Sequence, residues 1–537
     1  MRTFSKFLFL SVLLVFVSNC ARTGTPEGGP KDEEAPLFVT ANPPYESIKF
    51  DKKEIKIDFN EYVVLKELNK QLVVSPPMKN PPLISPQGSA SKFIKIEILD
   101  TLKLNTTYIF NFGNSIQDNN EANKLENFKY VFSTGDYIDS LTTKGSVRDA
   151  KLLKKPKDVS VLLYRIDSAF NDSIIYKEKP NYITNNIDSI GFKFTNLRKG
   201  KYLMLALQES VTDYIFNPKT DKIGFATNTI QLPKDSIINK PIILFKEEQP
   251  YQFKRGKEIT KGKIEFGFEG DAKNMRIKML SKVPEDFKSV SKFETEKDTL
   301  NFWFTPFETD SILFTVTNKR LKVIDTFNVK SRKVDPDSLR LQPNLSGSLD
   351  FNTSYHIAAN IPLTELDSSK ISIMNSDSTQ VTFAVTLDSL ENKVDFDFKT
   401  EPSQSYSVSL LPGAVTDFFG TENDSINYNL STKSLADYGN LSLTIDGKVQ
   451  YPMIVQLTNE KGEIQREIYA TEEQLFEFNA INPGMYLVRV IFDTNANRKW
   501  DPGNLLQKLQ PEKVIYYPGP VEMRANWEKI ETFTLTE

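Results

Sequence analysis

Residues Ile55-Lys56-Ile57-Asp58-Phe59 alternate apolar and polar side chains with a period of two. Downstream runs such as Tyr108–Phe112 and Tyr130–Phe132 are similar, and Gly, Pro, Asn or Asp residues separate such runs. This alternation is typical of a strand with one buried face. Helical periodicity is nearly absent, with one short turn expected at 64–72. The sequence therefore predicts an all-β chain of tandem β-sandwiches.

The chain has 537 residues, too many for one hydrophobic core and enough for about four or five domains. Hydrophobic residues make up 39% of it, and 38 Phe with 20 Tyr supply bulky core material. The 67 basic and 70 acidic residues leave a net charge of −3. Such a balance provides no overall field to attract nucleic acid or anionic lipid.

Cys20 is the only cysteine, and it follows the apolar run 7–17 closely. That run is too short to span a bilayer, which needs about 20 apolar residues. Arg2 and Lys6 precede it. Residues 1–19 resemble a bacterial lipoprotein signal peptide of the Bacteroidota type, which implies a lipid on Cys20 and an outer-membrane anchor. An ordinary secretory signal with an incidental cysteine is the alternative.

Residues 20–35 are rich in Gly, Pro, Thr and charge, so we expect a tether that does not fold alone. A single cysteine permits no internal disulfide, and each domain must therefore be stable through its own apolar burial. The sequence leaves open whether the periplasmic or the outer face of the membrane carries the protein.

Residues 36–136 resemble the SbsA-type bacterial Ig-like domain. The resemblance rests on Asn42-Pro43-Pro44, on residues 57–63 (IDFNEYV), on Leu104–Tyr108 (LNTTY) and on residues 128–134 (FKYVFST). It implies a sandwich used as a spacer or binding module.

A second, more diverged copy of this Ig-like pattern fits residues 345–433. Residues 406–410, 415–417 and 426–432 match 108–112, 116–118 and 128–134 of the first copy.

Another repeat links residues 192–202 and 476–486 with a constant offset of 284 and no gap. Both stretches read Phe-x-Phe, then Leu or Ile, then Gly-x-Tyr. They resemble the end of CnaB-like and carboxypeptidase-regulatory-like (prealbumin-like) sandwiches, which places such domains at 142–248 and 437–537. Residues 249–344 are predicted to form a β-domain of uncertain type.

The loop Asp493-Thr-Asn495-Ala-Asn497-Arg-Lys-Trp-Asp501 carries oxygen side chains at relative positions 1, 3, 5 and 9. This spacing predicts a weak calcium site, with an affinity of about 10⁻⁴ to 10⁻³ M. An Asx-rich turn held by side-chain to backbone hydrogen bonds explains the pattern equally well. In the first copy Val211 occupies a ligand position, so we expect no cation there.

Asp-Ser or Asp-Thr followed by an aliphatic residue recurs along the chain. The pattern resembles the O-glycosylation sequon of Bacteroidota, with Ser140, Ser189 and Ser338 as candidate acceptors. A turn that closes before the next strand is the alternative.

His356 is the only histidine, so nucleophile–base pairs and ordinary zinc sites lack the residues they need. We therefore expect a protein without enzymatic activity and without a required cofactor, calcium apart. The favoured function is a lipid-anchored scaffold, or an accessory subunit of an outer-membrane complex for assembly or secretion, with membrane or surface proteins as partners. A carbohydrate-binding or adhesion lipoprotein is the alternative, with polysaccharide as its partner.

Overall fold

The computed structural model describes residues 32–168, 170–186, 190–294 and 297–536. Strands dominate these residues, which confirms the all-β prediction, and each helical segment is about one turn. They are α2 (Leu68–Gln71), η1 (Asp172–Tyr176), η3 (Ser368–Lys370) and η4 (Leu435–Asp437). In this part of the chain no helix has both the length and the apolar character needed to cross a membrane. The predicted signal peptide, Cys20 and most of the tether lie outside the described residues.

The strands form five successive groups of sheets, which we call units 1 to 5. Unit 1 contains β1 (Phe38–Asn42), β2 (Glu54–Leu65), β3 (Val73–Ser75), β4 (Leu83–Ser85), β5 (Ser91–Glu97), β6 (Thr107–Asn111), β7 (Ile116–Asp118) and β8 (Lys129–Ser133). One sheet has the order β1-β2-β5-β4 and the facing sheet the order β3-β6-β8. Ile55, Ile57 and Phe59 of β2 point into the core between the sheets, as their alternation predicts.

Units 2 and 5 contain the repeat with the offset of 284. Unit 2 contains β9 (Leu141–Asp149), β10 (Val159–Arg165), β11 (Tyr182–Asn185), β12 (Gly191–Leu197), β13 (Gly200–Gln208), β14 (Lys222–Phe225), β15 (Ile230–Leu232) and β16 (Ile242–Leu244). Unit 5 contains β35 (Gly439–Gly447), β36 (Met453–Thr458), β37 (Ile464–Ala470), β38 (Phe476–Ile481), β39 (Gly484–Phe492), β40 (Val514–Tyr516), β41 (Val521–Met523) and β42 (Glu528–Leu535).

The two copies share one topology. The sheet order β11-β10-β13-β14 of unit 2 matches β37-β36-β39-β40 of unit 5, and β12-β9-β16 matches β38-β35-β42. Asn196 and Ala480 occupy equivalent positions at an irregularity in the pairing and have φ values of 56° and 50°. Tyr202 and Tyr486 both donate a 2.7 Å hydrogen bond to the carbonyl four residues earlier. The repeat therefore extends from sequence to local geometry.

Unit 3 packs two sheets around a Phe-rich core. It contains β17 (Gln252–Phe253), β18 (Lys257–Thr260), β19 (Lys263–Glu269), β20 (Met275–Met279), β21 (Ser289–Glu294), β22 (Thr299–Phe304), β23 (Ser311–Asn318) and β24 (Val323–Lys330). Phe266, Phe302 and Phe314 meet edge to face in this core, with ring centroids 5.3 to 6.4 Å apart. Such ring pairs add to the stability gained from burial alone.

Unit 4 repeats features of unit 1. It contains β25 (Leu341–Pro343), β26 (Gly347–Ser348), β27 (Tyr355–Ala359), β28 (Leu363–Leu366), β29 (Ile371–Asn375), β30 (Phe383–Asp388), β31 (Lys393–Phe398), β32 (Ser405–Leu410), β33 (Val415–Asp417) and β34 (Ile426–Ser431). The hydroxyls of Tyr108 and Tyr406 each accept a hydrogen bond from the backbone amide five residues earlier. Strand β25 precedes residue 345, so the sheets of this unit begin before that position.

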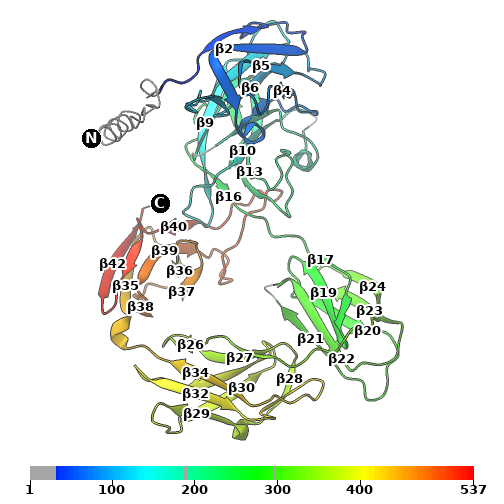
Figure 1. Cartoon of the computed structure of the whole chain (residues 1–537), viewed down its shortest axis with the longest axis vertical. Helices are drawn as coiled ribbons and strands as arrows, with labels where there is room; N and C mark the ends of the chain where they lie inside the picture. Colours follow the sequence, from blue (N-terminus) through cyan, green and yellow to red (C-terminus); the bar gives the residue numbers. More distant parts are fainter. Residues whose placement is uncertain (1–31, 169, 187–189, 295–296, 537) are drawn as a thin grey trace, which may run out of the picture.

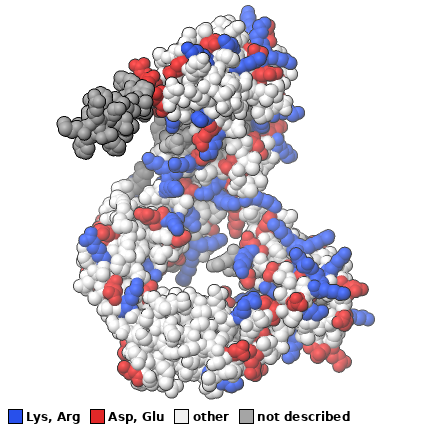
Figure 2. All heavy atoms as spheres, viewed as in Figure 1, with Lys and Arg blue, Asp and Glu red and all other residues white. Residues whose placement is uncertain are grey.

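Units 2 to 5 are arranged in a closed ring, and unit 1 extends from unit 2 (Figure 1). Residues 510–514 of unit 5, which lead into β40, line one pocket together with residues of unit 2, although units 3 and 4 separate these segments in the chain (Figure 1). The space-filling view shows a hollow at the centre of this ring, with Lys and Arg side chains along part of its edge (Figure 2).

Candidate functional site

The contact between units 2 and 5 closes the ring, and one loop of unit 5 makes much of it. The segment between β39 and β40 has 21 residues (493–513), whereas the equivalent segment of unit 2 has 13 (209–221). In the longer segment the backbone amide of Leu505 donates a 2.6 Å hydrogen bond to Glu247 of unit 2. Gln510 donates to the carbonyl of Phe225 at 3.2 Å. The added residues of the second copy thus bind the first copy.

Gly503 allows this loop to approach the sheet of unit 2 closely. A Cβ atom at this position would lie 2.6 Å from the ring of Phe245 and 2.6 Å from the carbonyl oxygen of Leu509. At these distances neither the ring nor the carbonyl oxygen leaves room for a methyl group. A glycine is therefore required here by contact rather than by backbone conformation.

Arg489 is the central polar residue of the junction, and it is only 1% exposed. Its guanidinium donates to Gln456 at 2.6 Å within unit 5 and to the carbonyl of Lys151 in unit 2 at 2.9 Å. The hydroxyl of Tyr516 also donates to that carbonyl. In unit 2 the equivalent position is Leu205. The second copy therefore has a buried cation where the first has an aliphatic side chain.

Lys151 and Trp500 pack against each other on the same junction. The Lys151 ammonium lies 4.9 Å from the centre of the indole ring, and the indole N–H donates to the carbonyl of Glu512 at 3.1 Å. Burial, with the nearby Arg489, lowers the pKa of Lys151. Attraction between the ammonium and the ring partly offsets the cost of holding this charge in a partly buried place.

One hydrophobic cluster extends through three units. Val73 of unit 1 and Leu505 of unit 5 both belong to the cluster that covers the outer face of the large sheet in unit 2. Strands β10 and β13 are buried on both faces as a result. Units 1, 2 and 5 therefore pack as one body.

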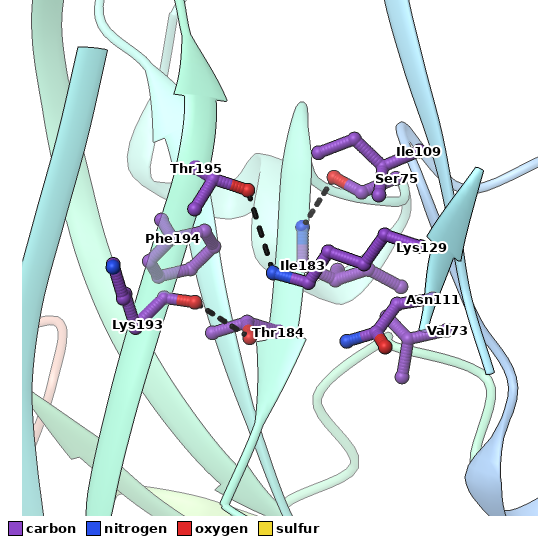
Figure 3. A pocket seen from close by; sticks show the side chains of 10 residues that line it. All are labelled: Val73, Ser75, Ile109, Asn111, Lys129, Ile183, Thr184, Lys193, Phe194 and Thr195. Atoms are coloured by element: carbon purple, nitrogen blue, oxygen red, sulfur yellow. Dashed lines mark hydrogen bonds between the residues drawn. The ribbon is translucent and has the colours of Figure 1, made fainter. Parts of the chain in front are cut away.

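The junction between units 1 and 2 places strand β3 beside β11 (Figure 3). The backbone amide of Ile183 donates to the Ser75 hydroxyl at 3.1 Å, and Lys129 contacts the Thr195 hydroxyl at 3.5 Å. The space left between these side chains is about 20 Å³, enough for about one water molecule. Burial, together with Lys193, lowers the pKa of Lys129. The close fit indicates a fixed junction.

Units 4 and 5 are also joined by polar contacts. Asp350 accepts hydrogen bonds from the Tyr438 hydroxyl at 2.7 Å and from the Asn482 amide at 2.9 Å. Lys433 donates to Asn482 at 2.8 Å. Burial and the hydrogen bond to Asp350 raise the pKa of Tyr438.

The loop with the predicted calcium ligands forms the same turn in both copies. Asp493 is fully buried and accepts hydrogen bonds from the amides of Asn497 at 3.1 Å and Arg498 at 2.8 Å. Glu209, at the equivalent position, accepts from the amides four and five residues later at 3.2 and 2.7 Å. Tyr214 and Arg498 both have a φ of 64°. The turn therefore forms even though Val211 replaces one of the candidate ligands in the first copy.

The remaining candidate ligands lie together at the tip of this loop. The side-chain amides of Asn495 and Asn497 both donate to Asp501. A cation could replace these amide donors only if both amides turned their oxygens inward. The described residues contain no group of three or more His, Cys, Asp or Glu side chains arranged to hold a metal ion. Weak calcium binding at Asp493, Asn495, Asn497 and Asp501 stays a prediction.

Two of the three candidate glycosylation sites can be placed. Ser140 and Ser338 are exposed, and Ser189 lies outside the described residues. Asp139, which precedes Ser140, is buried between units 1 and 2, where it contacts Thr107 and Arg198. The aspartate of this pair thus has a structural role, and modification of the serine stays a prediction.

The tryptophans do not form a shared platform for sugar rings. Trp303 is 3% exposed within unit 3, and Trp500 lies in the junction of units 2 and 5. Trp527 is 42% exposed, and Arg524 lies 4.7 Å from its ring centre. His356 is half-buried in β27, where burial and Lys393 lower its pKa. Among the described residues it has no arrangement typical of a catalytic base.

A protein-family model matches the first unit. Residues 32–134 match the family model of the Bacterial Ig-like domain. This match covers β1 to β8 and confirms a bacterial Ig-like domain in this part of the chain. No curated protein matches the chain.

Several solved structures align with the chain at low sequence identity. Domains 1–6 of the surface layer protein SbsC are 12% identical and cover 91% of this chain and 67% of their own length, with a TM-score of 0.15. The BSP domain of a biofilm-associated protein is 8% identical and covers 88% and 97%, also with a TM-score of 0.15. Titin domains A168–A170 are 10% identical and cover 52% and 98%, with a TM-score of 0.14.

Sequence reasoning missed the junction between units 2 and 5. Residues 487–492 read Leu-Val-Arg-Val-Ile-Phe, a nearly continuous apolar run rather than an alternating one. Such a run is typical of a strand buried on both faces. Arg489 lies inside this run, where the other copy has Leu205. A charged residue in a strand buried on both faces could have indicated that this strand contacts another part of the protein.

Proposed function

We propose that this chain is a non-enzymatic, lipid-anchored protein of the bacterial outer membrane that holds other envelope proteins in a fixed arrangement. The ring closure carries the proposal. Tandem modules joined only end to end would bend at each linker, and units held by a buried Arg489 and a shared hydrophobic cluster resist bending. A rigid body with several exposed sheet edges suits a scaffold, because partners can pair with such edges.

The sequence supports the location. The signal-peptide pattern before Cys20 and the polar tether after it would place the ring a short distance from a membrane surface. Since stable anchoring needs more than one acyl chain, the full lipid modification of Cys20 would be required. A Cys20→Ala variant should leave the membrane fraction, whereas an Ala21→Ser variant should remain there.

Crosslinking in intact cells, followed by purification of the full chain, tests the scaffold function. We expect reproducible recovery of the same outer-membrane proteins from the wild type and weaker recovery from a variant with an open ring. Retention on a polysaccharide column, together with no recovered protein partner, would instead support the carbohydrate-binding alternative.

A further inference from the structure

A cavity of about 260 Å³ lies between units 3 and 4. Strands β21 and β22 form one wall, and residues 359–360 and 391–392 of unit 4 form the other. The volume approaches the lower end of the range for small-molecule sites, about 300 Å³, and greatly exceeds the roughly 30 Å³ of one water molecule.

Three side chains of the unit 3 wall carry buried polar atoms without hydrogen-bond partners. Asn301 is fully buried, and neither its amide nitrogen nor its amide oxygen has a partner. The indole nitrogen of Trp303 and the ammonium of Lys292 are likewise buried and unpartnered. Lys292 and Asn301 are direct cross-strand partners, so their side chains share one face of the sheet. Buried groups of this kind are rare in native proteins because they are costly.

The opposite wall provides an internal comparison. Asn392 donates to the carbonyls of Ala359 and Ile361 and accepts from the amide of Leu363. Asn360 donates to Ser338 and Asp337 and accepts from the amide of Arg340. Both amides of unit 4 are therefore satisfied within their own loops. Among the buried side-chain atoms of the described residues that line this cavity, the unpartnered ones all belong to unit 3.

The unpartnered atoms define the chemistry of an occupant. They offer three donors, one of them cationic, and a single acceptor. Within the described residues Lys292 has no carboxylate within salt-bridge distance, whereas Glu294 at the cavity edge is paired with Lys297 at 3.2 Å. A carboxylate could accept from Lys292 and the Trp303 indole, while Asn301 pairs with a neighbouring hydroxyl or amide.

We propose that the cavity lined by Lys292, Asn301 and Trp303 binds a small molecule that carries a carboxylate group. Because the site lies between units 3 and 4, the bound molecule would also bridge this part of the ring.

The charges around Lys292 predict how binding depends on pH. Glu294 of its own strand and Asp388, Glu391 and Lys393 of unit 4 surround it, and burial lowers its pKa to about 8. Since a carboxylate binds the protonated amine, affinity should be constant between the pKa of the ligand's own carboxyl, ordinarily about 4, and about pH 8, and should fall above pH 8.

Calorimetric titration of the full chain with two matched pairs of probes tests the site. The pairs are succinate with succinamide and glucuronate with glucose, which separate simple acids from sugar acids. We expect at least one acid to bind and its neutral counterpart to bind at least tenfold more weakly. Equal binding within each pair, or no binding of either acid, would overturn the proposal.

Two variants separate a binding role from a structural one. Lys292→Met and Asn301→Leu should reduce acid binding at least tenfold and raise the unfolding temperature of unit 3, because each removes unpaired polar atoms. Lys278→Met and Asn328→Leu, which replace exposed residues on the other sheet of unit 3, should leave acid binding unchanged. Unchanged binding with lower stability in the first two variants would contradict the proposal. An amide bond between the side chains of Lys292 and Asn301, formed with loss of ammonia, would consume both groups. Mass spectrometry that finds the full chain lighter by one ammonia, with the crosslink mapped to these two residues, would therefore also overturn the proposal.

Discussion

At the scale of single residues, Arg489 determines how the two copies of the repeat meet. It occupies a strand position that holds Leu205 in unit 2, and its guanidinium has acceptors in both units. A buried cation of this kind is tolerated only when its donors are satisfied. The guanidinium therefore joins the outer face of the large sheet in unit 5 to unit 2, whereas Leu205 on the equivalent face of unit 2 lies in the apolar cluster that units 1 and 5 cover.

We expect Arg489→Leu to weaken the junction by about 3 kcal/mol, because hydrogen bonds to charged groups are lost and their acceptors stay buried. Native-state hydrogen exchange of the β39 and β40 amides measures this loss. Arg524→Leu removes an exposed ion pair with Glu522 and should cost less than about 0.5 kcal/mol. Equal losses in the two variants would show that Arg489 does not hold the junction.

Glu209 gives unit 2 a dependence on pH. Burial raises the pKa of its carboxyl to about 7. Between about pH 4.5 and 7 the folded state retains a proton that the unfolded state has released, so stability falls as pH rises through this window. Glu209→Gln should flatten the decrease in the unfolding temperature of unit 2 over this range. The exposed Glu285→Gln should retain the wild-type slope.

At the scale of elements, period-two patterning predicted the strands and the repeat offset predicted the shared turn geometry. Ile55, Ile57 and Phe59 point inward as expected, because one buried face is all that this pattern requires. The docking of the 493–513 loop could not be predicted in the same way. It depends on Gly503 meeting the ring of Phe245. These residues lie in units that are far apart in the sequence, and the alternation of apolar and polar residues gives no information about contacts between units. The cavity beside Asn301 was missed for a related reason, since a strand sequence does not reveal which polar side chains lack partners.

The loops that follow β13 and β39 should differ in their response to calcium. If the affinity of the 493–501 loop is about 10⁻³ M, then 10 mM calcium should stabilise unit 5 by about 1.4 kcal/mol and leave unit 2 unchanged. Thermal unfolding with and without a chelator measures the difference. An Asp501→Asn variant should lose the response, and an equal response in that variant would place the cation elsewhere.

At the scale of the whole molecule, ring closure fixes the distances between units that the sequence separates widely. Consecutive units meet through their own contacts, and the pairing of units 2 and 5 adds a second path between them (Figure 1). Opening that one junction would free units 3, 4 and 5 to move together away from unit 2.

Gly503→Ala should open the ring, because a methyl group would overlap the Phe245 ring and the Leu509 carbonyl oxygen. Small-angle X-ray scattering should then report a larger radius of gyration than that of the wild type. Gly267→Ala in β19 is a suitable control, since its Cβ would lie 3.4 Å from the nearest side-chain atom, an ordinary contact. A radius of gyration unchanged in both variants would mean that the ring tolerates the methyl group.

The two sides of this junction lie far apart along the chain, so the ribosome makes the unit 2 side well before the unit 5 side. Lys151 and Arg489, which bond directly, are 338 positions apart. At typical translation rates, the outer face of unit 2 with Phe225 and Phe245 would emerge on the order of tens of seconds before unit 5 can cover it. During that interval a newly made chain therefore presents an apolar sheet face that unit 1 covers only in part and that its last unit has yet to cover.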